Sequence, residues 1–292
     1  MRAASVIVML LAIIAASEAS AFDIETTRPM ALAGGSRAQC PSNAALYLNP
    51  AGLSLARVYH VETLYSYVPT SNGHVVGASV VDSVTSTLAM GLSFNYITWD
   101  PDHEDRSEYD VRLAAAYAIG SYFALGLTLK YLYAEMEGRG PLGPNVMERN
   151  GDDPLNTVTV DVGAIITIRN MLNIGVVGYN LTSTGSSSAP ISLGTALSLQ
   201  LRNFAIVADV LLDFTTREDL SIRVMGGAEY FLGNHYPIRL GYRYDDGRGS
   251  HAISGGFGYV SQSWGIEISL RQDVSAEDLE TVLGLTLRYF AN

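Results

Sequence analysis

The sequence predicts an all-β fold: a transmembrane antiparallel β-barrel of about 14 strands with an N-terminal plug segment. Three observations predict it. Apolar and polar residues alternate along many segments after residue 56. Beyond the first residues, no segment reaches the roughly 18 apolar residues of a membrane helix. The loops that connect these segments alternate between short and long along the chain. A period of two is the signature of a strand with two different faces.

The composition of the two faces favours a membrane barrel over a soluble sandwich. In residues 281–290, aliphatic and aromatic side chains share one face, while Gly, Thr and Arg take the other. Residues 121–136, 236–246 and 263–272 repeat this arrangement. An apolar outer face with aromatic ends and a polar inner face is typical of transmembrane barrels, and the 17 tyrosines suit the interfacial girdles. A secreted β-sandwich is the alternative, because it also alternates.

The predicted strands and their links define a topology. Links after even-numbered strands are tight, whereas those after odd-numbered strands are mostly longer, the exception being the link near 69–72. This alternation is typical of bacterial outer-membrane barrels, and the even count predicts that both termini are periplasmic. The predicted strands span residues 57–68, 73–82, 86–97, 108–119, 121–136, 156–168, 171–182, 191–201, 203–214, 219–231, 236–246, 250–261, 263–272 and 280–290.

The N-terminal residues read as a targeting signal. Arg2 precedes an apolar run at 3–16, and small residues at 19–21 offer a cleavage site before Phe22. The predicted division is a signal peptide at 1–21, a plug segment at 22–56, lumenal and periplasmic, and a transmembrane barrel at 57–292. The alternative for the first residues is an uncleaved anchor helix.

Composition excludes several functions. The formal net charge is −11, which argues against nucleic acid as a partner because phosphate binding needs a basic surface. Cys40 is the single cysteine, and no Cys/His cluster has the spacing of a metal site, so no metal and no cofactor are expected. No Ser/His/acid set can be assembled from the sequence, so we do not expect an enzyme. Outer-membrane lipid is the expected surrounding of the barrel.

Strand parity predicts a set of charged residues that face the lumen. They can form a polar constriction that selects solutes, or buried ion pairs that pin the plug. Mixed signs on neighbouring strands favour ion pairs, and a plugged barrel over an open porin. The residues are Lys130, Asp209, Arg223, Glu229, Arg239, Arg243, Glu267, Arg271 and Arg288, together with Asp110, Arg112 and Asp161.

Several motifs carry a family resemblance. "NAALYLNPAGLS" at 43–54 follows the Gly- and Ala-rich "ALAGGSRA", and "LNIGVVGYNL", "GGAEYFLGNHYPIRLGYRYDDG" and "HAISGGFGY" follow in order. With these motifs the chain resembles the outer-membrane transporters of long-chain fatty acids and other hydrophobic compounds (FadL/TodX type), with their shorter PorV/PorQ-type relatives. The terminal "GLTLRYFAN" resembles the last strand that the barrel-assembly machinery recognises.

The resemblance implies a fold and a function. It implies a 14-strand barrel that passes hydrophobic, fatty-acid-like small molecules through a plugged lumen. It also implies that Asn49 and Pro50 fix a hatch, while Ala51 and Gly52 let it approach the wall closely. Alternatively, this "NPAG" element is only a turn that leads into the first strand. The PorV-type relatives imply a different function, a non-transporting scaffold or a partner in protein secretion.

Overall fold

A computed structural model describes residues 24–99, 106–134, 139–140, 143–144, 155–182, 189–216, 219–275 and 279–291. The predicted signal peptide and its cleavage position lie outside these residues. Within the described part of the chain, no helix combines the length and the apolar character needed to cross a membrane.

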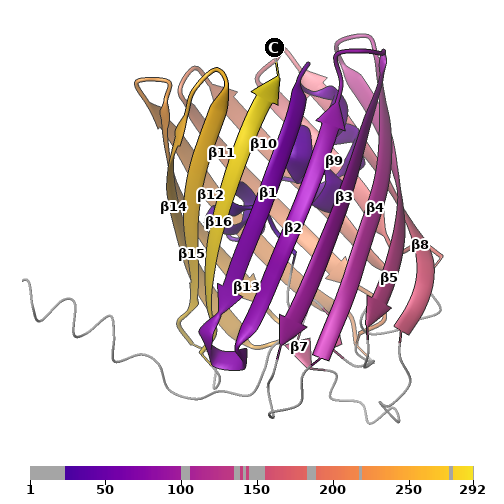
Figure 1. The fold of residues 1–292 in the computed structure, drawn as a ribbon, viewed down its shortest axis with the longest axis vertical. Helices are drawn as coiled ribbons and strands as arrows, with labels where there is room; N and C mark the ends of the chain where they lie inside the picture. The colour runs from indigo at the N-terminus through magenta and orange to yellow at the C-terminus, as the bar shows by residue number, and fades with distance from the viewer. Residues whose placement is uncertain are drawn as a thin grey trace, which may run out of the picture.

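Fourteen strands form one closed antiparallel barrel, in which each strand pairs with its neighbours in sequence and β16 closes on β1 (Figure 1). The predicted 14-strand barrel is therefore confirmed. The two-residue strands β6 (Arg139–Gly140) and β7 (Gly143–Pro144) form a separate small sheet. The barrel strands are β1 (Tyr59–Val68), β2 (Gly73–Asp82), β3 (Leu88–Trp99), β4 (Arg106–Ile119), β5 (Phe123–Ala134), β8 (Leu155–Ile168), β9 (Leu172–Tyr179), β10 (Ser192–Leu201), β11 (Phe204–Asp213), β12 (Ser221–Leu232), β13 (Tyr236–Asp245), β14 (Ser250–Val260), β15 (Trp264–Asp273) and β16 (Thr281–Ala291).

The two ends of the barrel differ. β1 begins and β16 ends at the same end, at the top of Figure 1, where tight turns such as 169–171 and 202–203 connect the strands. Arg169 and Asn170 both have positive φ, which matches the right-handed twist of a two-stranded hairpin. The opposite end carries the longer links, with two short exceptions, 69–72 and 246–249. We call these the short-turn end and the long-loop end.

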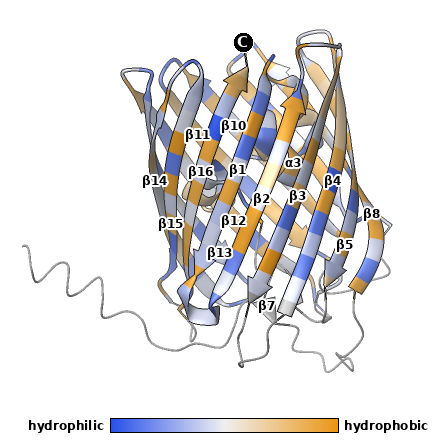
Figure 2. Ribbon diagram, viewed as in Figure 1, coloured by the Kyte–Doolittle hydropathy of each residue, from blue (hydrophilic) through white to orange (hydrophobic). Residues whose placement is uncertain are grey.

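The outer and inner faces of the wall have opposite polarity. Large apolar side chains such as Leu127, Leu240 and Ile268 are at least half exposed on the outside. On the inside, Arg239, Arg243 and Glu267 are among the largest fully buried side chains. Figure 2 shows the resulting alternation of apolar and polar residues along each strand. An apolar band around a closed barrel faces hydrocarbon, and closure leaves no unpaired strand edge there.

The lumen is occupied by residues 24–56, which we call the inner segment (Figure 1). It contains α2 (Thr27–Ala31), the 3₁₀ turns η1 (Ser42–Ala44) and η2 (Pro50–Ser54), and α3 (Ala45–Leu48). A third 3₁₀ turn, η3 (Pro69–Ser71), links β1 and β2. α2 contacts β13 to β16, whereas η2 contacts β3, β4, β5 and β8 across the barrel. The inner segment therefore bridges opposite sides of the wall.

A charge placed on the outer face tests the membrane band. Leu129 lies at the middle of β5 and is 46% exposed, and Val84 is 48% exposed in the turn between β2 and β3. We expect Leu129→Arg to lower the free energy of unfolding from lipid vesicles by about 2–4 kcal/mol, because the guanidinium enters hydrocarbon. Val84→Arg, the matched control, is expected to leave it nearly unchanged. Equal effects in denaturant titrations would contradict the proposed band.

Candidate functional site

The inner segment runs along the lumen from the long-loop end to the short-turn end. Glu25 Oε2 lies 2.9 Å from Arg271 Nη1, near the end of β15. Ser42 Oγ hydrogen-bonds Nδ1 of His60, the second residue of β1. β15 ends at the long-loop end, whereas β1 begins at the short-turn end. These two contacts therefore lie at opposite ends of the barrel. The segment thus spans the part of the lumen between them.

Arg28 is the main anchor of α2. Its Nε and Nη2 donate to the two oxygens of Glu229 on β12, at 3.1 and 3.2 Å. Its Nη1 donates to Ser36 Oγ at 2.6 Å and to the carbonyl of Gln39 at 2.7 Å. One buried guanidinium therefore joins the wall to two points of the segment itself.

A second anchor follows at Asp209 on β11. Its carboxylate accepts the backbone N–H groups of Ser36 and Arg37 at 2.9 and 2.8 Å, and Arg37 Nη1 at 3.2 Å. Arg37 Nε donates to Tyr179 Oη at 2.8 Å, and this hydroxyl in turn donates to the carbonyl of Leu48. The carboxylate thus fixes the turn that follows α2 by both main-chain and side-chain contacts.

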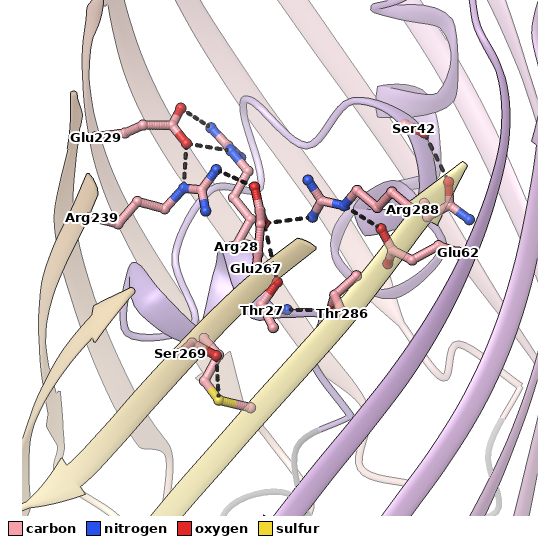
Figure 3. A network of polar contacts seen from close by, with 12 residues as sticks. Thr27, Arg28, Ser42, Glu62, Glu229, Arg239, Glu267, Ser269, Thr286 and Arg288 are labelled. Atoms are coloured by element: carbon pink, nitrogen blue, oxygen red, sulfur yellow. Dashed lines mark hydrogen bonds and ion pairs between the residues drawn. The ribbon is translucent and has the colours of Figure 1, made fainter. Parts of the chain in front are cut away.

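Acidic and basic side chains alternate in a ladder that continues from Arg28 around the wall (Figure 3). Glu229 forms an ion pair with Arg239. The carboxylate of Glu267 pairs with Arg239 Nη2 at 3.0 Å and with Arg288 Nη2 at 2.9 Å. Arg288 Nε reaches Glu62 Oε2 at 2.7 Å. Thr27 Oγ1 adds a hydrogen bond to Glu267 Oε2 at 3.1 Å, so the ladder holds α2 as well as five strands.

The charges predicted to face the lumen are distributed among several groups. Glu229, Arg239, Glu267 and Arg288 come together in the ladder, whereas the others pair separately. The separate pairs are Lys130–Asp161 at 2.7 Å, Arg112–Asp110 at 2.7 Å, Arg223–Asp245 at 2.8 Å, Arg243–Asp273 at 3.7 Å, Arg271–Glu25 at 2.9 Å and Asp209–Arg37.

Sequence reasoning missed Glu25, Arg28, Arg37 and Glu62 as partners, and also Asp245 and Asp273 at the ends of β13 and β15. Parity along β1 places Glu62 on the inner face, so alternation alone could have found it. No comparable period exists for Arg28 and Arg37, because the inner segment is not a strand.

Asn49 ties the turn at residues 49–52, where the hatch is predicted, to the wall. Its Nδ2 lies within hydrogen-bond distance of the carbonyls of Arg37, Ala164 and Val176, at 3.1, 3.3 and 3.4 Å. Its Oδ1 accepts the N–H of Ala51 at 3.2 Å and so caps η2, which begins at Pro50. A side-chain cap followed by proline is a favoured way to start a helical turn. Asn49 thereby ties the segment to both β8 and β9.

Glycines allow the close approach of this turn to the wall. A Cβ at Gly163 on β8 would lie 2.0 Å from Asn49 Oδ1, and one at Gly126 on β5 would lie 2.2 Å from the nitrogen of Ala51. Within the segment, a Cβ at Gly52 would lie 2.3 Å from the carbonyl oxygen of Cys40. These three positions have no room for any larger residue.

The rest of the second half of the segment packs through apolar contacts. Leu46 and Leu53 are buried in a cluster with small or aliphatic wall residues on β2 to β5 and β8. Tyr47 Oη donates to Asn95 Oδ1 at 3.0 Å, and the guanidinium of Arg112 lies 4.8 Å from the centre of the Tyr47 ring. Cys40 is fully buried, and desolvation raises the pKa of its thiol to about 12.

A hydroxyl, an imidazole and a carboxylate lie next to one another in space, from Ser42, His60 and Glu62. The separation of His60 Nε2 from Glu62 Oε2 is 3.9 Å, too long for a hydrogen bond, and Glu62 is engaged by Arg288 instead. The acid is therefore not positioned to orient the imidazole as in a hydrolytic triad. Among the described residues, no group of three or more His, Cys, Asp or Glu side chains could hold a metal ion.

A closed barrel with an apolar outer face and a charged, occupied lumen defines an integral outer-membrane protein. No protein-family profile and no curated protein matches the sequence.

Solved structures do match, over nearly the whole chain. The toluene transporter TbuX of Ralstonia pickettii aligns with a TM-score of 0.66 at 12% identity, over 92% of this chain and 98% of that one. A FadL homologue of Pseudomonas aeruginosa aligns at 0.65 and 12%, over 94% and 99%. A TodX deltaS2S3 mutant, a monoaromatic hydrocarbon channel, aligns at 0.67 and 14%, over 93% and 100%. The resemblance to the FadL/TodX type is confirmed at the level of the fold.

The native Cys40 reports whether the turn at residues 49–52 is seated against the wall. In the folded wild type we expect very slow labelling by a membrane-impermeant maleimide, because the thiol is buried and its pKa is raised. Gly163→Ala is expected to push Asn49 from the wall, to destabilise the seated turn by about 1–3 kcal/mol and so to speed labelling on the order of 10-fold. Gly226→Ala is the control, because its Cβ would meet only Val207 O at 3.8 Å. Equal labelling rates in the two variants would contradict the proposed role of Gly163.

Proposed function

We propose that this protein passes hydrophobic small molecules across the outer membrane, with the inner segment acting as a plug inside the barrel. The observation that carries the proposal is the way the segment meets the wall around residues 43–54, through buried apolar side chains rather than ion pairs. The similar folds of a toluene transporter and a monoaromatic hydrocarbon channel support the same class of cargo.

The hatch is the turn formed by Asn49, Pro50, Ala51 and Gly52. Asn49 holds three carbonyls and caps the turn, so a change at this one side chain releases the segment from β8, β9 and residue 37 together. A hydrophobic molecule passes by parting apolar contacts and replacing them with its own.

The wider organisation follows from this role. We infer that residues 1–21 are removed, that residues 22–56 form the plug, and that residues 57–292 form the barrel. The short-turn end, where β1 begins and β16 ends, then faces the periplasm. Membrane lipid covers the apolar band, and the barrel-assembly machinery binds the β16 sequence during biogenesis. The proposed ligand is an uncharged or fatty-acid-like small molecule.

A non-transporting scaffold, as in PorV-type secretion partners, is the second candidate. The observation that favours it is the number of buried ion pairs that tie the inner segment to the wall, at Glu25, Arg28 and Arg37. Breaking a buried pair by removing one partner costs about 3–5 kcal/mol, so this part of the segment is firmly held.

Flux through reconstituted barrels separates the two candidates. The vesicles carry lipopolysaccharide in their outer leaflet, which slows the direct entry of toluene into the lipid, and those with the protein are expected to take up radiolabelled toluene faster than protein-free vesicles of the same lipid. Asn49→Ala is expected to raise the rate severalfold, because losing these hydrogen bonds weakens the closed state by about 1–3 kcal/mol. Asn203→Ala, in the turn between β10 and β11, is the control. Wild-type uptake no faster than that of empty vesicles would favour the scaffold.

A further inference from the structure

The two halves of the inner segment differ in charge. Residues 25–37 carry Glu25, Arg28 and Arg37, whereas residues 43–54, "NAALYLNPAGLS", carry no charged side chain. The three charges pair with Arg271 on β15, Glu229 on β12 and Asp209 on β11. All the charges that the segment contributes between residues 25 and 54 therefore bind one arc of the wall, from β11 to β15.

The uncharged half lies against the opposite arc. Its apolar side chains contact small or aliphatic wall residues, which are Val81, Ala89, Ala114, Ala116, Ala124 and Ile165 on β2, β3, β4, β5 and β8. We call this contact surface the apolar seam. Its polar contacts are neutral on the segment side: Asn43 Nδ2 to Ser79 Oγ at 2.5 Å, Tyr47 Oη to Asn95 Oδ1, Asn49 Nδ2 to the carbonyl of Ala164 at 3.3 Å, and the carbonyl of Leu46 to Arg112 Nη1 at 3.1 Å.

Arg112 is the one cation that touches the segment at the seam among the described residues. Its Nε and Nη2 donate to the two oxygens of Asp110 at 2.7 and 2.8 Å, so its charge is balanced within β4 itself. Moving the segment away from β4 removes one hydrogen bond to a carbonyl but leaves the ion pair intact. No buried charge loses its partner when the seam opens.

The ionic arc behaves in the opposite way. Moving residues 25–37 away from it would separate Arg37 from Asp209 and Arg28 from Glu229 in a lumen largely closed to water, which is costly even though Glu229 keeps Arg239. At the seam, a hydrophobic molecule that enters separates the apolar side chains of the segment from those of the wall, and then covers both surfaces itself. The arrangement therefore favours opening on one side of the segment only.

We propose that the hydrophobic cargo travels along the apolar seam, between residues 43–54 and strands β2 to β5 and β8, while residues 25–37 stay fixed on the ionic arc. This route rests on the proposed transport function and specifies its path. It fits an uncharged, apolar cargo, because the cargo meets no unbalanced charge along the seam.

Two matched crosslinks distinguish the arcs. A Cβ at Gly91 on β3 would lie 2.8 Å from Leu46 Cδ2 at the seam, and a Cβ at Gly227 on β12 would lie 2.8 Å from Leu32 Cδ2 on the ionic arc. In a Cys40→Ala background, L46C/G91C and L32C/G227C each replace one leucine and one glycine by cysteine. The new side chains occupy the volume vacated by the leucine and lie within reach of disulfide geometry after small shifts.

The experiment measures radiolabelled toluene uptake into the same lipopolysaccharide-covered vesicles, which contain each double variant, oxidised and then reduced. Disulfide formation is checked by gel shift, and folding by the heat-modifiable band. We expect oxidation of L46C/G91C to abolish uptake above the protein-free background and reduction to restore it, whereas L32C/G227C keeps its rate within 2-fold in both states.

The other outcomes are equally informative. Loss of uptake with the oxidised L32C/G227C pair, alone or together with the seam pair, overturns the one-sided route, because it means that the ionic arc has to move. Full uptake with both oxidised pairs overturns it too, since the cargo then does not cross the seam. A Cys40→Ala parent that takes up no more toluene than empty vesicles refutes transport itself, which is a failure of the proposed function rather than of the route alone.

Discussion

Pairing of the buried charges inside the barrel is the constraint on which the rest of the structure depends. The outer face must be apolar to meet hydrocarbon, so the charges of the wall are turned inward, where each needs a partner. The wall alone does not supply all of them: Glu229 and Asp209 are completed by Arg28 and Arg37 of the inner segment. The barrel therefore orders its own contents, and the segment takes one position along the lumen.

This constraint explains why so much of the fold follows from the sequence. A strand in this wall separates lipid-facing from lumen-facing side chains at every second residue, so alternation in 281–290 or 236–246 marks both the strand and its orientation. The inner position of Glu229, Arg239 and Glu267 follows from the same parity. Their partners do not, because which inner residues meet depends on register around the barrel and on a segment without any period. Arg288 and Glu62, for example, are 226 residues apart.

Local sequence patterns do not predict the structure of the inner segment. α2 and α3 have five and four residues, too short to be stable by themselves, so their helical form depends on the walls around them. The motif around Asn49 marks the right place through its resemblance to a family. Its physical basis, three carbonyl acceptors and two glycines on separate strands, becomes visible only when residues 37, 126, 163 and 176 come together.

Hydrogen exchange on the folded, membrane-reconstituted protein tests most directly whether the segment is held inside the barrel by these contacts. Four amides of the segment are hydrogen-bonded: Met30 N–H to the carbonyl of Thr26, Ser36 and Arg37 N–H to the Asp209 carboxylate, and Gly52 N–H to the carbonyl of Asn49. The account predicts that these four amides exchange as slowly as amides in the β-strands. Exchange of these four amides at the rate of an unprotected peptide, with the strands still protected, would contradict it.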